Sequence, residues 1–208
     1  ASFPWKSPFA RQAFTHPLAL TLVAFFVTAI PSFLLSKVIG ENLESLTIIG
    51  CSLVTGGVAM WAIDRACKNP RVLRLEEMTL AQATWSGAVQ ILSAVFPGTS
   101  RSMSTIAGGQ LAGLSRTAAL EFSFFVSIPT MVAATGYDLL KSTVLSKGDV
   151  PAVLMTADRW LTLGVGFVVS FAVAWAVIAW FMGWVKRRGF VPFAIYRIVF
   201  GAAVLAAA

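Results

Sequence analysis

The sequence predicts an all-α, polytopic integral membrane protein with about five transmembrane helices and one re-entrant helical hairpin. Of its 208 residues, 57% are hydrophobic and only 12% are charged, and its mean hydropathy is +0.79. A soluble domain carries about 25% charged residues. At about 20 residues for each span, the chain has room for five or six spans. We therefore expect residues 1–208 to form a single membrane domain.

The charge and the rare side chains exclude other classes of protein. The net charge of +7 would suit nucleic acid, but the basic residues cluster at the ends of apolar segments, as in loops at a membrane surface. We expect a membrane environment and no nucleic-acid partner. Cys51 and Cys67 lie about one span apart on one predicted helix and its exit, too far apart to form a disulfide. His16 is the only histidine, so no Cys/His metal cluster is expected.

The chain opens with a segment that is neither a signal peptide nor a span. Residues 1–17 lack a long apolar run and are expected to form a loop. Pro17 suits the first turn of a helix. A span over residues 18–36 follows, with a kink expected at Pro31.

The second predicted span covers residues 46–63. It contains Gly56 and Gly57, whose small size permits close contact between helices. A charged loop is expected at residues 64–77.

The middle of the chain predicts two short helices in place of one span. Thr79 is a plausible N-cap for a helix over residues 80–96, which is short of a full span. Pro97 and Gly98 end that helix, and a second short helix over residues 102–114 follows. We expect a re-entrant hairpin over residues 80–114, with a single kinked span as the alternative.

The last third of the chain predicts three further spans. These cover residues 118–137, 161–185 and 190–208. A polar loop is expected at residues 138–159, and a tight basic turn at residues 186–189.

The basic residues predict the orientation of these spans. With a re-entrant hairpin, most of them fall on one side, which is then cytoplasmic. The residues expected on that side are Lys6, Arg11, Arg65, Lys68, Arg71, Arg74, Arg116, Lys186, Arg187 and Arg188. Those expected on the other side are Lys37, Lys141, Lys147 and Arg159. If the hairpin were one full span, Arg116 and the turn at residues 186–188 would move to the other side, and the basic residues would be less unequally distributed. The unequal distribution therefore favours re-entry.

The polar stretch at residues 97–102, Pro-Gly-Thr-Ser-Arg-Ser, lies between two apolar segments, at the expected depth of the membrane. An ionisable side chain is costly there, so its default interpretation is functional. The planar guanidinium of Arg101 matches two phosphate oxygens, and Ser100 and Ser102 can donate hydroxyl hydrogen bonds. A helix beginning near Ser102 would point its free N–H groups at the loop. These features predict an anion site, with phosphate as the natural ligand.

Four other residues are expected around the ligand. Gly98 permits a tight turn, and Thr99 and Thr105 are placed among the substrate-binding groups. Gln90 either lines the same cavity or makes a contact between helices.

Two charged residues are candidates for supporting roles. Glu121 either pairs with Arg101 or Arg116, or reaches a metal or the site. Arg197 lies about seven residues into the last span, where snorkelling to the surface is favoured over direct contact with the ligand. No metal ligands are identifiable.

Several ordered blocks resemble one known family. Residues 97–102, followed by Thr105-Ile106 and Gly108-Gly109, resemble the second signature of the undecaprenyl-diphosphate phosphatases, the bacitracin-resistance family. Residues 121–124 with Pro129, and residues 192–197, resemble further blocks of that family in the same order.

The resemblance implies an architecture of inverted repeats, each with a re-entrant hairpin, in the bacterial inner (plasma) membrane. It implies cleavage of a C55 polyprenyl diphosphate to the monophosphate and inorganic phosphate, which recycles the lipid carrier of cell-wall synthesis. Arg101 would hold the diphosphate, and Ser100 and Ser102 would position it. The resemblance also implies a divalent cation, Mg or Ca, and allows a homodimer.

The sequence departs from the family pattern in two ways. Met103 stands where the family has a glycine after its second serine. The family's first signature, an acidic Glu/Gln-x-x-x-Glu pair and a Ser-Ser-Thr-Gly-His loop, is absent, and His16 does not match its histidine. We therefore expect a fragment of a longer protein that is inactive by itself, because nothing in it convincingly transfers a proton.

Three other functions compete with this one. A transporter or flippase for an anionic lipid or small anion would use the same broken helices. An acid-phosphatase-like lipid phosphatase is excluded because no histidine follows Ser100-Arg101. A non-catalytic scaffold would leave Arg101 unexplained.

Overall fold

The computed structural model of the chain describes residues 16–35, 40, 45–143 and 157–208. Every regular element in these described ranges is a helix, and the β structure found in them is one isolated bridge between Val72 and Leu114. The all-α prediction is therefore confirmed. The elements are α2 (Pro17–Leu34), α4 (Leu46–Ala66), the 3-10 turn η2 (Leu75–Glu77), α5 (Leu80–Val95), α6 (Arg101–Leu111), α7 (Arg116–Thr143), α8 (Ala157–Arg188) and α9 (Val191–Ala207).

Four of the described helices, α2, α4, α7 and α8, are long and apolar enough to cross a membrane. The apolar α9 is only slightly shorter, at 17 residues. Together these helices match the prediction of about five spans. The expected loop over residues 1–17 lies mostly outside the described residues, and α2 begins at Pro17 as expected.

Several predicted boundaries were wrong. The basic turn expected at residues 186–189 is helical up to Arg188, where α8 ends. The helix α4 continues to Ala66, into the charged loop expected at residues 64–77. The helix α7 continues to Thr143 and α8 starts at Ala157, so both ends of the polar loop expected at residues 138–159 are helical. The cause is that a helix extends past the apolar stretch when its end lies outside the apolar layer, where polar side chains are solvated. Residues 144–156 lie outside the described part of the chain.

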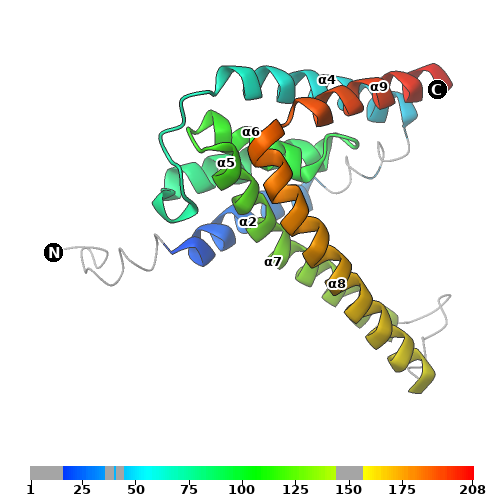
Figure 1. Ribbon diagram of the computed structural model, residues 1–208. Helices are drawn as coiled ribbons and strands as arrows, with labels where there is room; N and C mark the ends of the chain where they lie inside the picture. The colour runs from blue at the N-terminus through cyan, green and yellow to red at the C-terminus, as the bar shows by residue number, and fades with distance from the viewer. Residues whose placement is uncertain (1–15, 36–39, 41–44, 144–156) are drawn as a thin grey trace.

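The hairpin of α5 and α6 is antiparallel, and its two ends lie together (Figure 1). At these ends the side-chain Nε2 of Gln82 donates to the carbonyl of Ala112 at 2.9 Å, and the amide of Arg71 donates to Gly113 O at 2.8 Å. The helices α5 and α6 have 16 and 11 residues, or about 24 and 17 Å. Neither helix alone crosses a hydrocarbon core of about 30 Å. The antiparallel pair agrees with the expected hairpin, and its re-entry into a membrane stays a prediction.

The start of each hairpin helix follows from its cap. Thr79 and Gln82 form a reciprocal capping box at the start of α5, as the sequence predicted for Thr79. In α6 the hydroxyl of Ser100 accepts from Met103 N at 3.4 Å. Ser100 is therefore the N-cap and the helix begins at Arg101, one residue before the predicted start.

Small residues let the helices approach closely. A Cβ atom at Gly57 would lie 2.9 Å from the carbonyl oxygen of Ala194, and one at Gly87 would lie 2.7 Å from Ala24 O. The first contact joins α4 to α9, which lie side by side in Figure 1, and the second joins α5 to α2. The predicted role of Gly57 is thus confirmed.

Three loops meet at one end of the bundle around Asp64, which is 2% exposed. The Arg116 guanidinium forms the one ion pair found among the described residues, with the Asp64 carboxylate. The amide of Phe190 also donates to that carboxylate, at 3.4 Å. The ends of α4, α6 and α8 therefore share one side, as the charge pattern predicted.

The helix α8 is the least covered element of the described chain. No residue of its most apolar 18-residue window is buried, and Figure 1 shows it extending away from the other helices beside α7. Its apolar surface suits contact with lipid.

Candidate functional site

The loop that joins α5 to α6 forms the tip of the hairpin and has a constrained backbone. Gly98 has φ of 91°, and its Cβ position would lie 2.8 Å from the carbonyl oxygen of Ile49 on α4. This confirms the tight turn expected at Gly98. Ser100 has φ of 67°, and among the described residues it alone combines a side chain with positive φ. Such a conformation costs about 1–3 kcal/mol and persists only where the surroundings hold it.

Arg197 of α9 holds this loop from one side. Its Nη2 donates to the carbonyl oxygens of Gly98 at 2.9 Å and Thr99 at 3.1 Å. The expected snorkelling of Arg197 is therefore wrong, whereas its candidacy as a supporting residue agrees with this geometry. The reason lies on another helix: Gly56 of α4 leaves room for the guanidinium, since a Cβ there would lie 2.8 Å from Nη2.

Arg101 at the start of α6 turns towards the opposite side. Its Nη2 donates to the Thr130 hydroxyl of α7 at 2.8 Å. Thr105 lies one turn further along α6, and its hydroxyl lies 3.0 Å from the carbonyl oxygen of Arg101 and 2.6 Å from Gln90 Oε1. Gln90 and Thr105 are thus buried together directly behind the loop.

Glu121 does not pair with Arg101 or with Arg116. No ion pair or hydrogen bond of the described residues involves the Glu121 side chain. The reason is its position on α7. Thr130, which Arg101 contacts, lies nine residues further along that helix, or about 14 Å away along its axis, and Arg116 is taken by Asp64.

The predicted site residues are divided among three cavities, and the two smaller ones hold the charged side chains. The first, which we call the Ser100 pocket, has a volume of about 320 Å³ and holds Ser100, Ser102 and Arg197 among aromatic side chains. The second, the Arg101 pocket, has a volume of about 220 Å³. It is lined by Phe25, Thr28, Ala29, Ser32, Gln90, Ser93, Ala94, Arg101 and Thr130.

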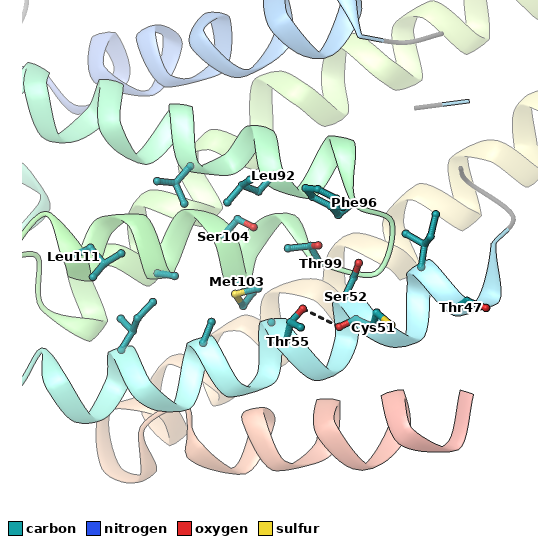
Figure 2. A pocket seen from close by; sticks show the side chains of 16 residues that line it. Thr47, Cys51, Ser52, Thr55, Leu92, Phe96, Thr99, Met103, Ser104 and Leu111 are labelled. Carbon is teal, nitrogen blue, oxygen red and sulfur yellow. Dashed lines mark hydrogen bonds between the residues drawn. The ribbon is translucent and has the colours of Figure 1, made fainter. Parts of the chain in front are cut away.

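A third and larger cavity, the α4 groove, runs along the hairpin. It has a volume of about 620 Å³ and extends between α4 and the helices α5 and α6, from Thr47 and Thr99 to Leu111 (Figure 2). Its lining is dominated by apolar groups. Thr99 and Met103 bring the groove up to the site loop.

The electrostatics of the loop favour an anion. Two arginines adjoin it, and no carboxylate of the described residues lines any of the three cavities. The N-terminus of α6 adds N–H groups and the positive end of its dipole. The described residues do not offer a metal site, because no three His, Cys, Asp or Glu side chains among them come together.

This arrangement defines a polytopic membrane protein in which two short helices meet at a charged loop with hydroxyls beside it. The chain belongs to the family described as bacitracin resistance protein BacA, whose sequence profile matches residues 4–203.

Similar proteins have one common name. A protein of Koribacter versatilis is 56% identical over 99% of this chain and 73% of its own length, and one of Polaromonas sp. is 42% identical over 97% and 70%. A third, of Caldanaerobacter subterraneus, is 39% identical over 89% of this chain and 65% of its own length. Each is named undecaprenyl-diphosphatase.

Two residues of the arrangement were missed by sequence reasoning. Thr130 contacts Arg101. Its position could have indicated this, because its hydroxyl directly follows Pro129, which has no backbone N–H and interrupts the hydrogen bonds of α7. Asp64 was assigned to a loop, although an acidic residue that ends an apolar span is itself a signal of a partner.

Proposed function

We propose that the protein hydrolyses undecaprenyl diphosphate to undecaprenyl phosphate and inorganic phosphate in the inner membrane of a bacterium. The reaction recycles the lipid carrier of cell-wall synthesis. The observation that carries the proposal is the site loop: Arg101 and Arg197 adjoin a strained turn, and within the described part of the chain no carboxylate lines the surrounding cavities. The name shared by the similar proteins supports it.

The chain's own residues account for binding and for stabilisation of charge. The guanidinium of Arg101 holds phosphate oxygens and offsets the charge that builds on them as the anhydride bond breaks. The Ser100 hydroxyl accepts from Met103 N, so its own proton is free to donate to an oxygen. Ser102 lines the Ser100 pocket and adds a second hydroxyl there. Arg197 acts by positioning the loop carbonyls.

The α4 groove suits the hydrocarbon part of this substrate. It is apolar, and it starts at Thr99 on the loop that would hold the phosphates. The first isoprene units would lie along α4, and the remainder would extend into lipid.

Two parts of the machinery stay predictions. The acidic pair and the histidine that would transfer protons are expected in sequence outside these 208 residues. A divalent cation, Mg or Ca, is implied by the family, but the described residues do not present a donor set for it, so we assign it no step. A homodimer also stays a prediction.

Transport is the less favoured function, because the similar proteins are named for hydrolysis. The test is release of inorganic phosphate from undecaprenyl diphosphate by the natural protein that contains this chain, purified in detergent. We expect release that disappears when Arg101 is replaced. Movement of the intact lipid diphosphate without cleavage would favour transport. In a second assay, rapid cleavage by the 208-residue chain alone would contradict the expectation that proton-transferring residues lie elsewhere.

A further inference from the structure

A polar cavity lies at the end of the hairpin away from the site loop. It has a volume of about 310 Å³ and is lined by the end of α6, the exit of α4 and the loop that follows α4. Arg101 begins α6 and Gln110 lies nine residues further along it, about 14 Å away along the helix axis. We call this cavity the Arg71 pocket. Among the described residues that line it, none is shared with the Ser100 pocket or the Arg101 pocket.

Arg71 is fixed beside this cavity, but its charge is unpaired. Its backbone amide donates to Gly113 O, and a Cβ atom at Gly113 would lie 3.7 Å from Arg71 Cβ and 3.9 Å from Arg71 Cδ. The guanidinium makes no ion pair or hydrogen bond with another described residue. No Asp or Glu occurs among the described residues that line the pocket. A guanidinium in this position favours an anionic ligand.

Gln110 contributes an acceptor that lacks a donor. Its side chain lines the pocket and is 3% exposed, and its Oε1 is buried without a hydrogen-bond partner. Buried polar atoms in folded proteins normally have a partner. The pocket therefore suits a ligand that combines an anionic group for Arg71 with an N–H or O–H donor for Gln110.

The surroundings of the pocket are typical of a membrane surface. Trp61 of α4 is exposed, and the Arg65 guanidinium lies 4.5 Å from the centroid of its ring. Tryptophan and basic side chains gather at the level of the lipid head groups. Leu111, which lines the pocket, is also exposed and offers an apolar contact. Basic pockets between the ends of membrane helices are known to bind the head groups of anionic lipids.

The Arg71 pocket adjoins the α4 groove. Leu111 lines both cavities, and Ala66 of the pocket lies one turn along α4 from Ile63 of the groove. Figure 2 shows Leu111 at one end of the groove and Thr47 at the other. A lipid whose head group binds in the pocket can therefore lay an acyl chain against the apolar end of the groove.

We infer that the Arg71 pocket binds the head group of a membrane glycerophospholipid. Arg71 contacts the phosphodiester, and Gln110 accepts a hydrogen bond from the ammonium of an ethanolamine head group or from a hydroxyl of a glycerol head group. The neighbouring acyl chain lies at the Leu111 end of the α4 groove. The inference goes beyond the proposed hydrolysis, because none of the residues assigned to that reaction lines the pocket.

Lipid binding tests the inference without any measurement of hydrolysis. The natural protein that contains this chain is mixed in detergent with phosphatidylethanolamine, phosphatidylglycerol or phosphatidylcholine, and bound lipid is measured by native mass spectrometry. Phosphatidylcholine keeps the phosphodiester but its head group has no N–H or O–H donor, so we expect it to bind about tenfold more weakly than phosphatidylethanolamine.

Two variants separate the contributions of the pocket residues. We expect Arg71→Met to weaken the binding of all three lipids at least tenfold. Gln110→Met removes the acceptor, so we expect roughly tenfold weaker binding of phosphatidylethanolamine and no change for phosphatidylcholine. Arg74→Met is the matched control for net charge, because Arg74 is an exposed residue of the same loop that does not line the pocket, and it keeps the affinity of the parent.

Cys67 gives a second readout inside the pocket. It lines the cavity and is half-buried, so a bound head group shields its thiol. We expect phosphatidylethanolamine to slow the labelling of Cys67 by a water-soluble maleimide, followed by peptide mass spectrometry, and we expect Arg71→Met to remove this protection.

Four results would overturn the inference. The first is equal lipid affinity in the parent, Arg71→Met and Gln110→Met. The second is equal weakening in Arg71→Met and Arg74→Met, which would show attraction by net charge alone. The third is a Gln110→Met variant with a higher Tm and unchanged binding of phosphatidylethanolamine, which would make Gln110 an unpaired core residue. The fourth is a loss in Arg71→Met that affects a prenyl monophosphate and no phospholipid.

Discussion

Ser100 and Arg101 are neighbours in the chain, yet their side chains line different cavities. The separation follows from the start of α6. Ser100 is the cap with positive φ, and Arg101 is the first helical residue, so their side chains leave the backbone in different directions. The loop therefore stands between two pockets, one with the Arg101 guanidinium and the other with Ser100, Ser102 and Arg197.

Arg101→Lys tests whether the planar guanidinium is needed. A lysine keeps the charge but cannot make a forked contact or hold Thr130 in the same geometry. We expect a loss of phosphate release of about 100-fold or more, in the range seen when a transition-state donor is removed. Arg74→Lys, at an exposed loop position, is the control and keeps normal turnover. Near-normal activity in Arg101→Lys would place the phosphate site elsewhere.

Arg197→Met tests the support of the loop from α9. The variant keeps an unbranched side chain beside Gly56 but leaves the carbonyls of Gly98 and Thr99 without their donor. We expect at least a tenfold lower kcat, measured as phosphate release at saturating substrate. Arg187→Met removes an exposed positive charge from the end of α8 and controls for net charge. Equal rates in the two variants would mean that the loop keeps its shape without Arg197.

Gly98→Ala tests the contact of the loop with α4. The new methyl would meet the carbonyl oxygen of Ile49 at 2.8 Å in a backbone conformation that disfavours a Cβ. We expect the loop to shift and phosphate release to fall more than tenfold. In Gly136→Ala, where nothing lies within 4 Å of the added atom, activity stays normal. A fully active Gly98→Ala would show that the turn tolerates displacement.

Asp64→Asn tests the contact that joins three loops. Asparagine keeps one acceptor oxygen but loses the ion pair with Arg116 and weakens the bond from the Phe190 amide. Because Arg116 is 42% exposed, we expect a moderate loss of about 2 kcal/mol in the free energy of unfolding. Thermal unfolding in detergent would show this as a decrease in Tm of roughly 4–8 °C. Asp158→Asn changes an exposed carboxylate and leaves Tm within a degree or so of the parent.

Ala59→Trp tests the α4 groove as the place of the prenyl chain. Ala59 lines the groove, and an indole there would fill part of its volume. We expect KM for undecaprenyl diphosphate to rise about tenfold, with little change for a diphosphate whose prenyl chain is too short to reach Ala59. Val58→Trp, on the neighbouring exposed position of the same helix, separates groove filling from added bulk. A similar KM in both variants would exclude the groove.

Local signals were enough to predict the hairpin and its loop. The Thr79 cap, the Pro97-Gly98 break and the charge at Arg101 each depend on only a few neighbouring residues, so each can be recognised from the local sequence. The distribution of basic residues likewise predicted that the loops around Asp64 lie on the same side of the protein.

The directions of the two arginines could not be predicted, because they depend on distant residues. Arg197 points inward because Gly56, on another helix, leaves space for it. The residues of α9 alone do not indicate that this space exists. Arg101 turns to Thr130 and not to Glu121 because α7 brings the middle of its length to the loop. Both choices are made by packing between elements.

The support that Arg197 gives the loop has a consequence for the synthesis of the protein. Gly98 and Thr99 leave the ribosome long before α9, so their carbonyl groups wait for a donor that is made almost a hundred residues later. Until α9 enters the bilayer, the loop lacks the contact that fixes its shape. A chain that ends before α9 therefore has Arg101, Ser100 and Ser102 but lacks the two hydrogen bonds from Arg197 to the loop.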